Sequence, residues 1–182
     1  MPDLSSTSRE ALLEMARQTL TKFVKTGNEP SLQTEDPQLR EPRPCFVTLR
    51  EEGKLRGCVG SLRAQRPLYE EVARMTRAAA SEDFRFSSVQ PEELGRIKIE
   101  ISVLSPLERI GSPAEIEVGR HGIYLRWRDR SGAFLPEVAR EMNWTAEEFV
   151  RSCALDKAQI PEDALPEAEF YRFTTEKILE HV

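Results

Sequence analysis

The chain of 182 residues lacks any long hydrophobic run, and its apolar stretches are only a few residues long, as at 78–80. A transmembrane helix needs roughly 20 consecutive apolar residues, so none is expected. The N-terminal segment is polar and acidic, whereas a secretory signal begins basic and then becomes apolar. These absences predict a cytoplasmic protein.

Cysteine and histidine are scarce. Cys45, Cys58 and Cys153 are odd in number and far apart, which is typical of thiols in a reducing compartment rather than of a disulfide framework. His121 is the one internal histidine, because His181 is the penultimate residue. With so few nitrogen and sulfur ligands, we expect no metal site and no cofactor.

The usual nucleotide-binding and hydrolase motifs are also missing. The sequence contains no GxxxxGK(S/T), GxGxxG, HExxH, CxxC or GxSxG pattern. Its 31 acidic and 26 basic residues are intermixed and give a net charge of −5, so no overall field attracts polyanions. Nucleic-acid binding is therefore not expected, because it would need a local basic patch.

Hydrophobic periodicity predicts a chain of mixed helices and strands. A first helix runs from Ser8, expected as its N-cap, to a stop at Gly27. Further along we expect a proline-rich loop at 28–44, a hairpin of strands 45–50 and 54–62, a helix at 67–80, a helical turn at 91–94, strands at 97–104, 116–118 and 122–127, a turn at 129–132, helices at 134–142 and from Thr145, and a final strand at 170–173.

The sequence Glu-Val-Ala-Arg occurs twice, at 71–74 and at 137–140, each time after a hairpin-like segment. Two copies of a strand–helix unit that complete one curved sheet would produce such an echo. Chance similarity of four residues is the alternative.

The stretch KLRGCVGSL, residues 54–62, combines a strand pattern with candidate chemistry. Strand alternation places Arg56 and Cys58 on one face, roughly 7 Å apart along the strand, where the guanidinium would favour a nucleophilic thiolate. Gly57 and Gly60 would let a ligand or another backbone approach closely. The alternative is that Cys58 is a small buried hydrophobic residue and that the glycines mark a bulge.

Two further segments carry candidate residues. The turn at 119–122 is expected to expose the imidazole of His121 beside Arg120, either as a base or ligand-orienting group or with no role. In the segment 83–86, Asp83 and Arg85 are expected to pair with each other or with Arg56, while Phe84 or Phe86 anchors the loop in the core.

Five ordered segments resemble the AMMECR family, whose microbial members are called AmmeMemoRadiSam system protein A. They are LRGCVGSL (55–62), AAASEDFRF (78–86), IEISVLSPLE (99–108), GRHGI (119–123) and FLPEVARE (134–141). The resemblance covers roughly residues 9–179 and implies an α+β fold: two related strand–helix lobes share one curved, barrel-like mixed sheet with helices packed outside. It also implies a single domain over 1–182, with lobes at about 1–110 and 111–182.

The resemblance implies no established reaction. The family signature Leu-Arg-Gly-Cys-x-Gly maps onto Leu55–Gly60, with Val59 where isoleucine is usual. The family name implies a pathway shared with a Memo-like protein and a radical SAM enzyme. Two departures are Phe84 where proline is frequent and Glu137 where glutamine is frequent; Glu137 also lies in a first helical turn, where a carboxylate is favoured anyway.

Two functions remain open. The first is an enzyme or small-molecule-binding protein, with no membrane role, whose cleft takes an anionic ligand. Its catalytic residues would be Cys58 and His121, and its ligand-binding residues Arg56, Gly57, Gly60, Asp83, Arg85 and Arg120. The alternative is a non-catalytic adaptor for the Memo-like and radical SAM partners.

Overall fold

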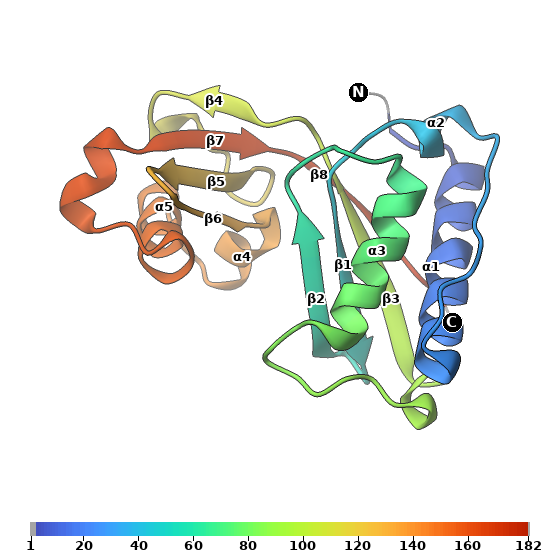
Figure 1. Cartoon of the computed structure of the whole chain (residues 1–182). Helices are drawn as coiled ribbons and strands as arrows, with labels where there is room; N and C mark the ends of the chain where they lie inside the picture. The colour runs from blue at the N-terminus through green and yellow to red at the C-terminus, as the bar shows by residue number, and fades with distance from the viewer. Residues whose placement is uncertain (1–2, 182) are drawn as a thin grey trace. The chain divides into compact units, whose positions relative to one another are not determined.

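The computed structural model describes residues 3–181, and contacts divide the chain into two compact units (Figure 1). Unit 1 comprises Met1–Leu104 with Glu176–Val182, and unit 2 comprises Ser105–Thr175. Unit 1 holds α1 (Ser6–Thr26), α2 (Pro37–Arg40), β1 (Cys45–Glu51), β2 (Lys54–Ser61), α3 (Leu68–Ser81), the short helix η1 (Pro91–Glu93), β3 (Ile97–Leu104) and most of β8 (Thr175–Leu179). Unit 2 holds β4 (Glu108–Ile110), η2 (Pro113–Glu115), β5 (Gly122–Trp127), β6 (Arg130–Phe134), α4 (Pro136–Glu141), α5 (Ala146–Ser152), η3 (Cys153–Ala158), η4 (Glu162–Glu167) and β7 (Glu169–Phe173).

The first helix confirms the sequence prediction, with one change at its start. Ser5, not Ser8, is the N-cap, and its side chain accepts a hydrogen bond from the Ser8 N–H. The Ser8 hydroxyl is buried and donates to Asp36 at 2.6 Å. Gly27 ends the helix in the left-handed region at φ 75°, which a residue without Cβ adopts at little cost.

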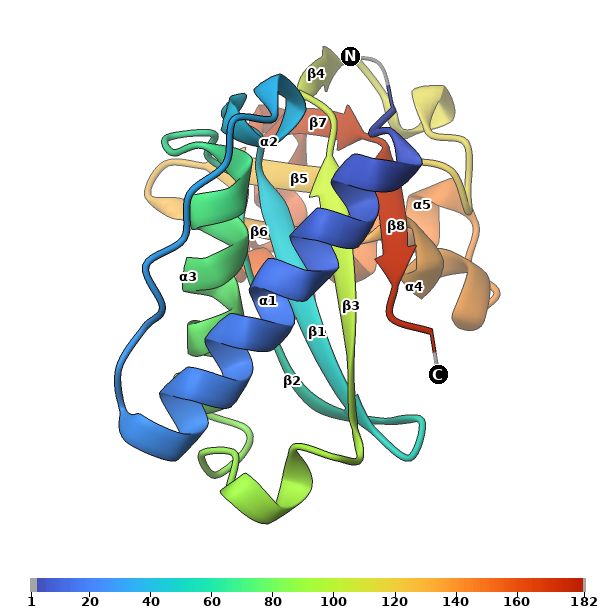
Figure 2. The same cartoon turned by 90° about the vertical axis from the view of Figure 1, so that its right-hand side faces the viewer.

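The sheet of unit 1 has the strand order β2-β1-β3-β8, and α1 and α3 pack on one of its faces (Figure 2). Alternate residues of β1 and β3, such as Val47 and Ile101, are fully buried in the core beneath these helices. The intervening residues, such as Thr48 and Glu100, therefore belong to the face that carries no helix of this unit.

A bulge interrupts the predicted hairpin. The pairing of β1 with β2 shifts between Leu49 and Arg50, so that Gly57 lies opposite Leu49 and Leu55 lies opposite Arg50. Arg56 is the extra residue, and strict alternation of side chains ends there. A Cβ on Gly57 would lie 2.2 Å from the carbonyl oxygen of Ala79, so the backbone of α3 occupies the space beside this glycine.

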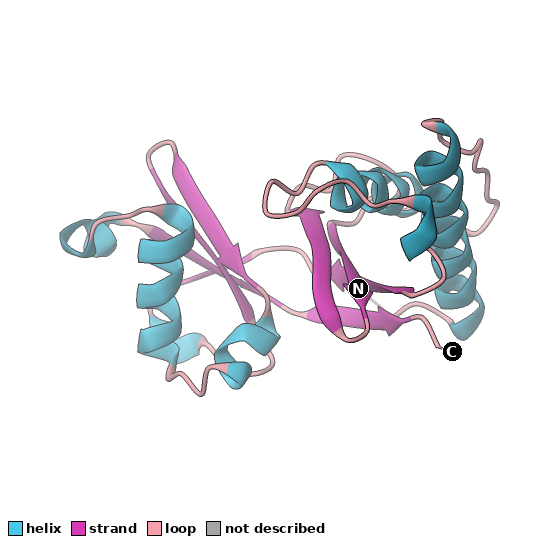
Figure 3. Cartoon of the chain, turned by 90° about the horizontal axis from the view of Figure 1, so that it is seen from below, coloured by secondary structure: helices cyan, strands magenta, loops and turns pink. Residues whose placement is uncertain are grey.

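The sheet of unit 2 has the order β4-β7-β5-β6, with α4, α5 and η3 packed on one face, as the colouring of Figure 3 makes visible. The α+β class is thus confirmed, and each strand pair with a described register is antiparallel. The strands form two four-stranded sheets rather than one, and residues 3–181 contain no closed barrel. A single shared sheet would need hydrogen bonds between strands of the two groups, and the described strands pair only within their own group.

Some local predictions in unit 2 were wrong. The expected strand at 116–118 is absent, because Pro113 opens the short helix η2, and a turn follows it. Of the expected turn at 129–132, Asp129 does lie in a turn, whereas residues 130–132 belong to β6. Phe134, expected to begin the next helix, also belongs to β6, and α4 begins at Pro136. In unit 1, strand β8 was not expected, since its sequence is polar and short.

Within residues 3–181, no helix combines the length and the apolar character that a membrane crossing requires.

We predict that Gly57→Ala destabilises the protein by about 1 to 3 kcal/mol, because the new methyl group clashes with the backbone of α3. Gly95→Ala is the matched control, since no heavy atom lies within 4 Å of a Cβ built there. Urea unfolding of both variants at equal concentration measures the difference. Equal midpoints for the two variants would contradict the close packing of β2 against α3.

Candidate functional site

Cys58 lies on the helix-free face of the unit 1 sheet, on the outer strand β2. Its residue is half-buried, and its Sγ accepts a hydrogen bond from the Thr48 hydroxyl at 3.2 Å. Its backbone N–H, which an edge strand would otherwise leave to solvent, donates to Oδ2 of Asp83 at 2.9 Å. The thiol is therefore fixed in place by side chains from β1 and from the loop after α3.

Asp83 and Arg85 form the charged part of this site. Asp83 is 7% exposed, and its two carboxylate oxygens accept from Nε of Arg85 at 2.9 Å and from Nη2 at 2.7 Å. The hydrogen bonds from Arg85 lower the pKa of Asp83 to about 2, against the opposing effect of burial. The same Nη2 lies 3.5 Å from the carbonyl oxygen of Cys58, so a guanidinium sits next to the cysteine.

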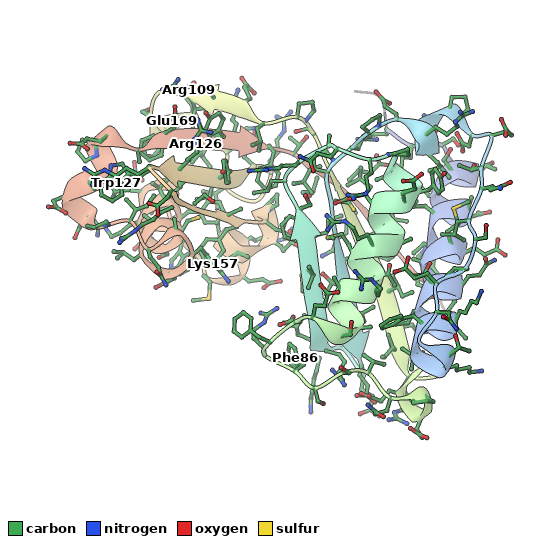
Figure 4. The ribbon with its side chains drawn as sticks, in the orientation of Figure 1. Phe86, Arg109, Arg126, Trp127, Lys157 and Glu169 are labelled. Atoms are coloured by element: carbon green, nitrogen blue, oxygen red, sulfur yellow. The ribbon has the colours of Figure 1, made fainter. Side chains whose placement is uncertain are left out.

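The two phenylalanines of this loop behave differently. Phe84 is 97% exposed, so of the two rings expected as the anchor of this loop, Phe84 is excluded. Phe86 is half-buried, and the guanidinium of Arg85 lies 5.5 Å from its ring centroid, as Figure 4 helps to locate. Side chains in a turn do not alternate regularly between inside and outside. The sequence alone therefore does not show which of the two phenylalanine rings is buried.

Arg56 has other partners than those the strand pattern predicts. Its Nε donates to Glu93 at 2.6 Å, and its Nη1 donates to the carbonyl oxygen of Ser87 at 2.9 Å. This pairing lowers the pKa of Glu93. The bulge at Arg56 breaks the alternation on which the prediction of an Arg56–Cys58 pair rested, and the guanidinium at the Cys58 main chain is that of Arg85.

Sequence reasoning missed two residues of the cross-strand row that contains Cys58: Thr48 next to it on β1, and Glu100 one strand further on β3. In the register, Thr48 of β1 lies opposite both Cys58 of β2 and Glu100 of β3. The Glu100 carboxylate accepts from Arg50 at 2.8 Å and lies 3.7 Å from Nζ of Lys177. The signal was present in the sequence, because Thr48 and Glu100 interrupt otherwise apolar strands at alternate positions.

His121 is not the exposed turn histidine that the sequence predicts. It is 9% exposed in unit 2, and its Nδ1 accepts a hydrogen bond from the Glu117 N–H at 3.0 Å. Burial, with the nearby charges of Arg172 and Arg120, lowers the pKa of His121. The lone pair of the neutral imidazole is thus occupied by the backbone, which favours a structural role. Arg120 pairs with Glu117 at the surface.

The other predicted residues and cysteines have structural surroundings. A Cβ on Gly60 would lie 2.1 Å from the ring of Phe46, so this glycine makes room for an aromatic side chain. Cys45 and Cys153 are fully buried, and burial raises the pKa of both thiols, that of Cys153 to about 12.

Glu137 lies in the first turn of α4. Across residues 3–181, no three histidine, cysteine, aspartate or glutamate side chains gather as a metal site.

Comparison with known proteins identifies the relatives of this chain. The family model AMMECR1 matches residues 13–178. The chain belongs to the AMMECR1 family. A protein of Methanothermobacter thermautotrophicus is 36% identical over 93% of each chain, and one of Thermococcus gammatolerans is 38% identical over 92% of this chain and 87% of its own.

The AMMECR1 fold also matches a solved structure. The crystal structure of the uncharacterized protein PH0010 from Pyrococcus horikoshii superposes with a TM-score of 0.86 at 34% identity, over 92% of this chain and 89% of that one. The names of these relatives state no activity.

We predict that Asp83→Asn removes on the order of 2 kcal/mol of stability at pH 7, because an amide cannot form the ion pair with Arg85. The folded-state pKa of about 2 lies below the ordinary 3.8, so the unfolded chain takes up this proton first as the pH falls. The stabilisation is complete above pH 3.8 and is lost as the pH approaches 2.

Urea unfolding between neutral pH and about pH 3 tests this. The difference in free energy of unfolding between the wild type and Asp83→Asn should be constant near neutral pH. It should become smaller as the pH falls below 3.8, the ordinary pKa of aspartate. Asp3→Asn, at an exposed carboxylate, is the control. A gap that does not change with pH would contradict the assigned pairing.

Proposed function

We propose that this AMMECR1 protein carries a thiol-dependent small-molecule site on the helix-free face of the unit 1 sheet, with Cys58 as the nucleophile. The observation that carries the proposal is the contrast among three thiols. Cys58 is half-buried beside a guanidinium and a hydroxyl, whereas Cys45 and Cys153 are fully buried among apolar residues. A neighbouring cation and partial access are the conditions under which a thiolate forms and reacts.

The exposed guanidinium of Arg85 indicates an anionic ligand. Its bonds to Asp83 use Nε and Nη2, and its side chain is 42% exposed, so the Nη1 donors can reach a carboxylate or phosphate. Thr48 and Glu100 add a hydroxyl and a carboxylate in the same cross-strand row. We assign Arg56 no ligand contact, because each of its three guanidinium nitrogens already donates to Glu93 or to the carbonyl oxygen of Ser87. An anionic electrophile bound at Arg85 and attacked by Cys58 fits this arrangement.

We predict that iodoacetamide at neutral pH modifies Cys58 well before Cys45 and Cys153, which should react only when the chain unfolds. Peptide mass spectrometry over a time course gives the three rates. Comparable rates for all three cysteines would show that Cys58 is not an activated thiol.

Substitutions of Arg85 sharpen this test. Arg85→Gln should slow alkylation of Cys58 by about threefold to tenfold, because it removes the positive charge beside the thiol that favours the thiolate. Arg85→Lys keeps the charge and should restore most of the rate. Arg96→Gln is the matched control, since Arg96 is a half-exposed arginine that pairs with Glu51 away from the site. If the control slows the reaction as much as Arg85→Gln, local electrostatics do not activate Cys58.

The exposure of Phe84 supports a second candidate, an adaptor module. Phe84 is 97% exposed at the tip of the loop that holds Asp83, and Leu55 on β2 is 37% exposed. Aromatic side chains of this kind are common anchors of protein interfaces. The partners would be the Memo-like protein and the radical SAM enzyme that the family resemblance implies.

For the adaptor, we predict that Phe84→Ala weakens capture of a purified Memo-like or radical SAM partner by about tenfold or more, the loss typical of a hot-spot residue. Cys58→Ala should bind as the wild type does. Affinity measured by surface plasmon resonance distinguishes the two candidates. Loss of binding in Cys58→Ala with retention in Phe84→Ala would exclude the docking role of Phe84.

A further inference from the structure

The unit 2 sheet also has a face without a helix of its own unit. Ile123 and Leu125 of β5 are buried beneath α4, α5 and η3, so the residues between them face the other way. The strand register aligns these outward residues in two rows across the sheet. One row is Arg109, Tyr171, Tyr124 and Ala133, and the next is Glu169, Arg126 and Ser131.

Two tyrosines form an aromatic platform in the middle of this face. Tyr124 and Tyr171 lie directly opposite each other on the central strands, and their ring centroids are 5.7 Å apart. Both residues are half-buried. On β6, Ala133 lies opposite Tyr124 and Ser131 lies opposite Arg126, and both have small side chains. The platform therefore offers ring surface that no large side chain of β6 covers.

Arginines border the platform. Arg126 donates through Nε to Glu169 at 2.6 Å, and Nη2 of Arg109 lies 3.8 Å from the same carboxylate (Figure 4). Two guanidinium groups thus share one carboxylate, and the pair of rows carries an excess of positive charge. This local balance differs from the acidic balance of the whole chain, which has a net charge of −5.

The end of the β5–β6 hairpin adjoins this surface, because Arg126 and Glu169 of the outer face also line a hollow there. A hollow of about 480 Å³ is lined by Arg126, Trp127, Arg128, Glu167 and Glu169. Arg128 has φ 55°, a conformation that favours glycine, and its guanidinium lies 4.3 Å from the Trp127 ring centroid. Among residues 3–181, no carboxylate forms an ion pair with Arg128. Arg128 therefore places a positive charge at a backbone position whose positive φ is more easily adopted by glycine.

We propose that this surface, made of Tyr124, Tyr171, Arg109, Arg126 and Arg128, binds the unpaired nucleotides of a single-stranded nucleic acid. Bases stack on the tyrosine rings, because every base has a flat π face, and phosphates contact the guanidinium groups. A duplex does not fit this chemistry, since its bases are already stacked and are not available to the rings. A free nucleotide carries the same chemistry, so the experiment separates these two sources.

Fluorescence anisotropy of a short, dye-labelled single-stranded RNA of mixed sequence tests the proposal on the full chain. The wild type should bind it with an affinity that falls as NaCl is raised. Tyr124→Ala should weaken binding about tenfold, the loss typical of one stacked base. Arg128→Gly should also weaken binding severalfold, and it should leave thermal stability unchanged or higher because glycine relieves the positive φ.

The control is Arg151→Ala, which removes one exposed arginine from α5 of the same unit, where Arg151 pairs with Glu162. It should bind RNA as the wild type does. AMP and inorganic phosphate serve as competitors: displacement by AMP assigns the surface to free nucleotides, and resistance to AMP assigns it to strands. The proposal is overturned if the RNA does not bind, if AMP displaces the RNA and so assigns the surface to free nucleotides, if phosphate competes as well as AMP, if a duplex binds equally, or if both Tyr124→Ala and Arg128→Gly bind normally.

Discussion

The candidate site depends on the hydrogen bonds that the carboxylate of Asp83 accepts. This carboxylate accepts the backbone N–H of Cys58, which the edge strand would otherwise leave to solvent, and it binds the guanidinium of Arg85 through both oxygens. One buried charge therefore fixes the edge of β2, the loop after α3 and the position of the cation beside the thiol. Its pKa of about 2 shows how strongly the fold favours the ionised form.

Charge pairing explains why similar arginines have different roles. Arg56 is a strand residue of the family signature, yet a bulge directs it to Glu93 and the carbonyl of Ser87, where it ties the hairpin to the segment before β3. Arg85 shares Asp83 with a backbone amide and keeps an exposed side chain. The first arginine ties the hairpin to the segment before β3, and the second keeps a side chain that is 42% exposed.

The two sheets bury their apolar residues in the same way but carry different side chains on their outer faces. Each has one face under helices, where apolar residues alternate inward, and one face that its own unit leaves without a helix. In unit 1 that face carries a thiol, a hydroxyl and a carboxylate at Cys58, Thr48 and Glu100. In unit 2 it carries the pair Tyr124 and Tyr171 with arginines. These polar and aromatic side chains therefore lie on faces that no helix of their own unit covers.

The sequence by itself determined the class of fold, the hairpin at Cys45–Ser61, the strand Ile97–Leu104 and the family, because these depend on local periodicity and motif order. It also singled out Cys58, Asp83 and Arg85. Only the tertiary structure decided that Arg85 rather than Arg56 reaches Cys58, that His121 is buried, and that Phe84 is exposed. These outcomes depend on a one-residue bulge, on a backbone donor and on a loop conformation, none of which leaves a periodic signal in the chain.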